Sequence, residues 1–105
     1  MLSTEARSLL RRVRARVDDE WDQGAFVREN PFGPPTYCLV GLLRHEVFGG
    51  NVVKVEPVYR EAIGALNNVL ETATLNRPVG GLIYWNDSEG RTKEDVKDLI
   101  DRALQ

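Results

Sequence analysis

Proline and glycine divide the sequence into four amphipathic blocks, and this division constrains the fold more than any other feature of the chain. The blocks run over residues 3–20, 36–48, 57–75 and 92–104. In each block, apolar residues recur at the spacing of one helix face. A chain of 105 residues can bury one hydrophobic core and is too short for two. We therefore predict a single all-α domain over residues 1–105, with about four helices.

Three of the blocks begin with residues that favour a helix start. Ser3, or the adjacent Thr4, is a good N-cap for the first helix. Thr92 begins a capping-box sequence that is completed by Asp95. Pro57 suits the first position of the third helix, because proline lacks the N–H group that this position leaves unbonded. These signals place three helix starts with little ambiguity.

The second block fits either a helix or a buried strand, because its apolar run over residues 36–43 is too short for periodicity to separate the two. We favour a helix over residues 36–48. Thr36 offers an N-cap, and Gly49 stands where the residue after a helix end is expected. Gly41 would then mark the close approach of another helix.

Two segments between the blocks lack helical spacing. Residues 22–35 are rich in proline and glycine and predict an irregular connection. We expect Phe26, Val27 and Phe32 to tuck against the core from this connection. Residues 82–85 predict one short extended segment, followed by a turn.

Composition excludes several classes of function. The formal net charge of −2 gives no overall positive field to attract nucleic acid or anionic lipid. Cys38 is the only cysteine and His45 the only histidine, which rules out an internal disulfide and a four-ligand Cys/His zinc site within one chain. Gly80-Gly81 lacks the residues of a phosphate-binding loop. We expect no cofactor, no bound metal and, without an apolar run of about 18 residues, a soluble cytoplasmic protein that binds no membrane.

Five arginines lie in the first block. Helical projection places Arg7, Arg11 and Arg14 on one side of the apolar face and Arg12 and Arg16 nearer the other side. A run of acidic residues follows and would repel a phosphate backbone. This separation of charge favours docking to a protein, or to a second copy of the chain, over nucleic-acid binding.

A thiol and an imidazole in the second block suggest a nucleophilic pair. Cys38 and His45 would share a helix face, but seven residues separate their Cα atoms by about 10 Å along the axis, too far for direct contact. Burial in the apolar run would also raise the pKa of the thiol. We therefore expect a core cysteine. If the protein is an enzyme, Asp87 is a better partner for Cys38 or His45.

The sequence Trp85-Asn86-Asp87 predicts an anchored, rigid loop. One interpretation is a binding site, in which Asn86 or Asp87 holds Arg91, a ligand or the backbone of a partner. The simpler interpretation is that Trp85 fills the core while Asn86, Asp87 and Ser88 form a turn leading to the next helix.

Three short motifs stand out in the sequence: Trp21-x-Gln23-Gly24, Cys38-Leu39-x-Gly41 and, most specifically, Trp85-Asn86-Asp87 followed by Arg91-Thr92-x-x-Asp95-Val96. Through these motifs the chain resembles a family of small uncharacterised proteins of actinobacteria and their phages. The resemblance spans most of the chain and implies a compact helical fold and a phage or actinobacterial origin. It transfers no catalytic residue.

The leading hypothesis is a small non-catalytic protein-interaction module that modulates a host protein, because the sequence holds no credible catalytic set, cofactor loop or metal cluster. A homodimer is one form that this interaction could take. The alternatives are a Cys38-dependent enzyme with His45 or Asp87, and nucleic-acid binding through the helix from Arg7 to Arg16. The predicted partner-binding residues are Arg7, Arg11, Arg14, Trp85, Asn86, Asp87 and Arg91.

Overall fold

The fold is all-α, as predicted, with one helix more than the sequence suggested. The computed structural model describes residues 2–49, 55–74 and 81–105. Within these residues the chain forms five helices. They are α1 (Thr4–Glu20), α2 (Leu39–Phe48), α3 (Val55–Thr74), α4 (Gly81–Asp87) and α5 (Lys93–Ala103).

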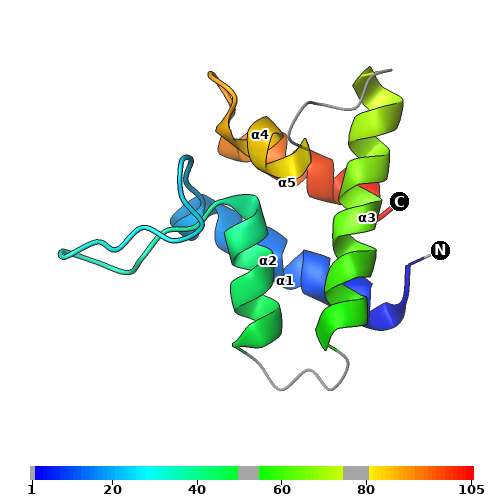
Figure 1. Cartoon of the computed structure of the whole chain (residues 1–105), viewed down its shortest axis with the longest axis horizontal. Coiled ribbons are helices and arrows are strands. Elements are labelled where there is room, and N and C mark those ends of the chain that lie inside the picture. Colours follow the sequence, from blue (N-terminus) through cyan, green and yellow to red (C-terminus); the bar gives the residue numbers. More distant parts are fainter. Residues whose placement is uncertain (1, 50–54, 75–80) are drawn as a thin grey trace.

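The helices pack in two layers. Helices α1 and α5 lie side by side and antiparallel in one layer, and α2 and α3 run antiparallel across them in the other (Figure 1). The short helix α4 contacts α2 and α3 near one end of this pair. One core fills the space between the layers. Among the described residues, its fully buried large side chains are Leu9, Leu10, Val13, Val17, Leu39, Leu42, Leu43, Val47, Leu66, Val96 and Ile100, with Asn86 as the one polar member.

The start signals of α1 and α5 are confirmed. The Ser3 hydroxyl accepts a hydrogen bond from the N–H of Ala6, which caps α1. At α5 the Thr92 side chain accepts from the N–H of Asp95, and the Asp95 carboxylate accepts from the N–H of Thr92. Both caps satisfy backbone donors that a helix start leaves without a partner.

Helix α2 begins later than predicted. The prediction of a helix for this block is correct, but its N-cap is Cys38 and not Thr36, which lies outside the helix. The N–H of Thr36 donates to the carbonyl of Arg28, and the N–H of Tyr37 donates to the carbonyl of Glu20. These long-range bonds hold both residues in extended backbone, so a local cap signal at Thr36 is overridden.

Helices α3 and α4 also differ from the sequence prediction. Helix α3 begins at Val55, which places Pro57 in the first turn and not at its first position. Proline is tolerated there because these N–H groups have no partner within the helix. The segment 82–85, predicted as extended, is helical and lies within α4. Within α4, Leu82 and Asn86 are four residues apart, so both face the core from one side of the helix.

Candidate functional site

An arm formed by residues 22–36 projects from one side of the helical body (Figure 1). An isolated antiparallel bridge joins the two sides of the arm. The N–H of Arg28 donates to the carbonyl of Thr36 at 2.8 Å, and the N–H of Thr36 donates to the carbonyl of Arg28 at 3.0 Å. At the base, the N–H of Asp22 donates to the carbonyl of Tyr37 at 2.8 Å. Paired backbone at the base makes the arm a defined element of the fold.

The tip of the arm presents one aromatic ring to solvent. Phe32 is 97% exposed, the highest value among the exposed large apolar residues. The Asn30 side chain accepts a hydrogen bond from the N–H of Phe32 at 3.0 Å, and its carbonyl accepts from the N–H of Gly33 at 3.3 Å. Both bonds are typical of an Asx turn set over a β-turn. The tip therefore has a local structure of its own.

The expectation that Phe26, Val27 and Phe32 tuck against the core is wrong. Phe26 and Val27 are 46% and 49% exposed, and Phe32 is almost fully exposed. The arm carries Phe32 away from the helices, whereas Phe26 lies at its base against α2 with its side chain partly exposed. No pattern in the sequence distinguishes an exposed phenylalanine from a buried one, apart from the prolines that flank Phe32 on both sides.

The base of the arm packs tightly against α2 at Gly41. A Cβ atom on Gly41 would lie 2.0 Å from the carbonyl oxygen of Phe26. The predicted close approach at Gly41 is correct, but the approaching backbone belongs to the arm and not to another helix. The guanidinium of Arg44 lies 5.3 Å from the centre of the Phe26 ring and covers it from α2.

Asn86 connects the arm base to three helices from a fully buried position. Its Oδ1 accepts from the indole N–H of Trp21 at 2.6 Å and from the N–H of Leu39 at 2.9 Å. Its Nδ2 donates to the carbonyl of Asp22 at 3.2 Å and to the carboxylate of Asp87 at 2.9 Å. Asn86 thus joins the end of α1, the start of α2 and the base of the arm to α4.

Two more contacts hold the arm to the end of α4. The Gln23 side chain donates to the carbonyls of Asn86 and Ser88, at 2.9 and 2.8 Å. The Asp87 carboxylate accepts from the N–H of Gly24 at 2.9 Å. Asn86 and Asp87, two of the predicted partner-binding residues, thus both contribute to the contact between the arm and α4, where Asn86 is buried and Asp87 is exposed.

Trp85 packs against the core, as the simpler interpretation expected, but it is only partly buried. The guanidinium of Arg91 lies over its ring, 4.0 Å from the ring centre. The Arg91 Nε donates to the Trp85 carbonyl at 2.9 Å, so Arg91 is bound by Trp85 and not by Asn86 or Asp87. Asn86 takes the buried position because it follows Leu82 by four residues on the inner face of α4. Exposed apolar side chains on the other faces of α4 are Ile83 and Tyr84, at 43% and 61% exposure.

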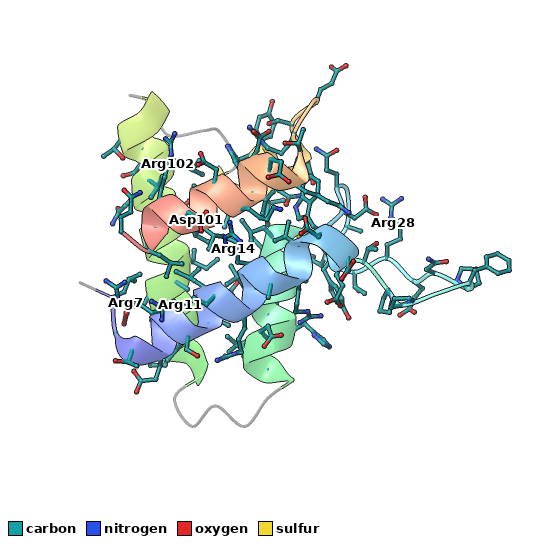
Figure 2. The ribbon with its side chains drawn as sticks, turned by 180° about the vertical axis from the view of Figure 1, so that it is seen from behind. Arg7, Arg11, Arg14, Arg28, Asp101 and Arg102 are labelled. Atoms are coloured by element: carbon teal, nitrogen blue, oxygen red, sulfur yellow. The ribbon has the colours of Figure 1, made fainter. Side chains whose placement is uncertain are left out.

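The arginines of α1 divide between two neighbouring helices, as helical projection predicted. Figure 2 shows Arg14 and Asp101 between α1 and α5, with Arg7 and Arg11 nearer the start of α1. Arg14 forms a two-pronged ion pair with Asp101 at 2.6 and 2.9 Å. Arg7 donates to the carbonyl of Leu104 at 2.8 Å. Arg11 is exposed.

The other side of α1 faces α2. Arg16 pairs with Glu20 at 2.7 Å and with Glu46 at 2.9 Å, and Arg12 pairs with Glu46 at 3.2 Å. The hydrogen bond from Arg16 lowers the pKa of the Glu20 carboxylate. Arg16 and Glu20 are four residues apart, a spacing that allows an ion pair along one helix, whereas Arg14 pairs with Asp101 and not with Asp18 at the same spacing. These arginines hold helices together and leave less of their charge for a partner.

A family comparison places the chain among its relatives. The model of a family of unknown function, DUF6197, matches residues 1–105. The chain belongs to this family. No curated protein and no solved structure matches it.

Cys38 and His45 of this DUF6197 member lie in separate surroundings. The Cys38 thiol is 2% exposed and accepts a hydrogen bond from the N–H of Gly41 at 3.3 Å. Burial raises the pKa of the Cys38 thiol, with Asp87 adding to the increase through its charge. The His45 ring packs at a tilt against the Tyr37 ring, with 5.0 Å between ring centres, and its Nδ1 lies 2.9 Å from the guanidinium of Arg16. A thiol held in its neutral form is a poor nucleophile.

Across the part of this family member that the structure describes, no group of three acidic, histidine or cysteine side chains is arranged to hold a metal ion. Within the same residues, no helix combines the length and apolar character that a membrane span needs. The arm, which α4 braces at its base, is the candidate functional site because it carries the 97% exposed ring of Phe32 at its tip.

Proposed function

We propose that this protein is a small non-catalytic protein-interaction module and that the arm is its main docking element. The observation that carries the proposal is the Phe32 ring, 97% exposed at the end of an ordered projection. Exposed aromatic residues on ordered surfaces are frequent anchors of protein interfaces. Ile83 and Tyr84 on α4 add an exposed apolar surface on the helix that braces the arm base.

The proposal extends to the setting in which the module acts. In this setting the module is a cytoplasmic modulator of a host protein, in an actinobacterium or one of its phages. The motifs around Trp21, Cys38 and Trp85 support this setting, because they resemble proteins from those sources. The exposed Arg11 on α1 offers a second, electrostatic contact for the same partner.

The two alternative functions have less support from the geometry. A Cys38-dependent enzyme would need a thiol that is accessible and readily ionised, and Cys38 is buried with a raised pKa. Nucleic-acid binding would need free arginines on α1. Arg12, Arg14 and Arg16 instead form ion pairs with carboxylates on this chain.

Site-specific photo-crosslinking tests the proposal. The photoreactive residue p-benzoylphenylalanine replaces Val27 on the arm, Ile83 on α4 or Arg11 on α1, in cells that naturally produce the protein. The matched control carries it at Asn68, an exposed position on α3 away from these surfaces. We expect one protein to be joined at Val27 and not at Asn68, and the purified pair to bind when mixed.

Two results would contradict the proposal. One is that Val27, Ile83 and Arg11 form only the adducts that the control position Asn68 also forms. The other is an adduct whose purified protein shows no binding by calorimetry, which marks a chance encounter in the cell.

A further inference from the structure

We infer that the turn over residues 30–33 is a preformed recognition element that inserts the Phe32 ring into an apolar pocket of a folded protein partner. The inference rests on the proposed function and specifies its partner: a protein with a concave apolar pocket wide enough for one phenyl ring. Three observations carry it: the order of the turn, the small area of the tip and the charge around it.

The turn makes its own hydrogen bonds within the chain, without any partner. The Asn30 side chain holds the N–H of Phe32, and the Asn30 carbonyl holds the N–H of Gly33. Pro31 stands between them and fixes its own φ angle near that of a turn. Below the turn, the strand pairing of Arg28 with Thr36 fixes where the tip points. An anchor that is already positioned loses little conformational entropy on binding, so one ring can contribute effectively to affinity.

The area of the tip indicates a pocket and not a flat interface. A phenylalanine ring buries about 150–250 Å² when it is fully enclosed. A stable flat interface needs about 800 Å² from each partner. Phe32 is flanked by prolines, glycine and Asn30, which add little apolar area. The tip can therefore bind tightly when the partner encloses the whole Phe32 ring. Only a concave site on the partner can enclose the ring in this way.

Charge at the tip favours a protein over a lipid surface. Residues 29–35 contain one charged residue, Glu29, and no lysine or arginine. Peripheral binding to anionic membranes depends on basic residues beside the apolar anchor. Glu29, three residues before Phe32, opposes that mode, and the preceding Arg28 is paired with Asp22 at 3.4 Å.

A second copy of the chain is a poorer fit than a different protein. The hollow of about 740 Å³ between α1, α3 and α5 is lined by Arg7, Glu61 and Arg102 among others. A smaller hollow of about 260 Å³ has Glu5 and Arg12 in its wall. A phenyl ring entering either hollow would take water from charged groups without replacing their hydrogen bonds.

Calorimetry with the partner joined at Val27, purified and mixed with unmodified full-length protein, tests the inference. We expect Phe32→Ala to weaken binding by at least about 30-fold, as for a central anchor, and Phe32→Leu to weaken it less. Asn30→Ala should weaken binding by about three- to tenfold, because the turn loses its side-chain acceptor. Asn30→Asp should restore affinity, since a carboxylate accepts the same N–H of Phe32. Glu29→Ala is the matched control and should bind within twofold.

The possible results separate this inference from the proposed function. If the partner still binds Phe32→Ala with unchanged affinity, the pocket model is wrong while the interaction module stands. If crosslinking finds no partner at any of the tested positions, both fail. Two further measurements would also overturn the inference: Phe32-dependent co-sedimentation with phosphatidylglycerol vesicles, and a dimer in sedimentation velocity that Phe32→Ala abolishes. Circular dichroism melting of each variant checks that the fold is kept.

Discussion

Asn86 shows at the scale of a single residue how a polar side chain can organise an apolar core. Its Oδ1 accepts the indole N–H of Trp21 and the backbone N–H of Leu39, the first residue of α2. Each donor is buried, so neither can turn to water if the acceptor is removed. A buried donor without a partner costs about 1–3 kcal/mol. Asn86 is therefore a stability-determining residue, although the sequence placed it on a partner-binding surface.

We predict that Asn86→Ala lowers the free energy of unfolding by about 2–5 kcal/mol, because two buried donors lose their acceptor and a cavity forms. Urea unfolding followed by tryptophan fluorescence measures the change, with Trp21 as a reporter next to the site. Asn68→Ala on the exposed face of α3 is the control and should stay within about 0.5 kcal/mol of the natural protein. An Asn86→Ala variant as stable as this control would show that the hydrogen bonds of Asn86 contribute nothing.

The second residue-scale prediction concerns the thiol of Cys38. Its 2% exposure and raised pKa predict that iodoacetamide modifies it slowly in the folded state. The rate should increase in urea until it reaches that of an unfolded cysteine. Mass spectrometry of timed samples at pH 8 gives both rates. Rapid modification without urea would instead support the Cys38 enzyme hypothesis.

At the scale of elements, the contact between the arm and α2 depends on the absence of a side chain at Gly41. We predict that Gly41→Ala destabilises the protein by about 1–3 kcal/mol, since its Cβ would lie 2.0 Å from the Phe26 carbonyl oxygen. Thermal unfolding of purified variants measures the difference.

Gly64 on α3 provides a matched control for Gly41, because both are glycines inside helices. A Cβ atom on Gly64 meets nothing within 4 Å. Gly64→Ala should therefore stabilise the protein by about 0.5–1 kcal/mol through helix propensity alone. If both alanine variants were stabilised equally, the arm would not be packed against α2 as the structure describes.

Elements with local signals could be predicted from the sequence, and elements set by distant contacts could not. Helices α1 and α5 follow from a capping residue and an apolar face within one segment. The start of α2 cannot be predicted from a local signal, because the N–H groups of Thr36 and Tyr37 donate to carbonyls of the arm and of α1. The helix at 82–85 was missed since seven residues are too few to show a period, and its inward position depends on Asn86 meeting Trp21 from α1.

The candidate site was harder to predict than the fold. Apolar residues in a connection are usually assigned to the core, because burial is their most common fate. The outward direction of Phe32 depends on the pairing of Arg28 with Thr36, which no local pattern announces. The arginines of α1 could be sorted into two groups from the helix period, but their partners Asp101 and Glu46 come from distant segments.

At the scale of the whole molecule, ion pairs on α1 tie it to α5 in its own layer and to α2 in the other layer. Arg14 bonds to Asp101, and Lys97 bonds to Asp18, so two pairs cross between α1 and α5. Both contacts lower the pKa of the carboxylate concerned, as Arg16 does for Glu20. These three groups are partly or well exposed, so each pair contributes modestly and is weakened by salt.

The lowered pKa values make stability depend on pH in a stated direction. In the unfolded chain the aspartates titrate near their ordinary value of 3.8 and Glu20 near 4.5. In the folded protein the pKa of each group lies below its unfolded value. At a pH between these two pKa values, the unfolded state therefore binds more protons than the folded state. The stabilisation is fully present above pH 5 and is lost as the pH falls through the lowered values. We predict a constant urea midpoint from pH 7 to 5 and a steady decrease below pH 4.

A substitution at one end of the α1–α5 contact tests whether these pairs cause the decrease. Asp101→Asn should cost less than about 1 kcal/mol at pH 7, because the pair with Arg14 is half exposed. Its difference from the natural protein should shrink as the pH falls below the lowered pKa of Asp101, because the carboxylate is then protonated in both states and the pair no longer exists. Asp19→Asn, which replaces an exposed carboxylate on α1, is the control and should show a small difference at every pH. A difference for Asp101→Asn that stays unchanged as the fold loses stability in acid would assign its effect to packing, and the acid sensitivity of the fold would then need a cause other than the ion pairs between α1 and α5.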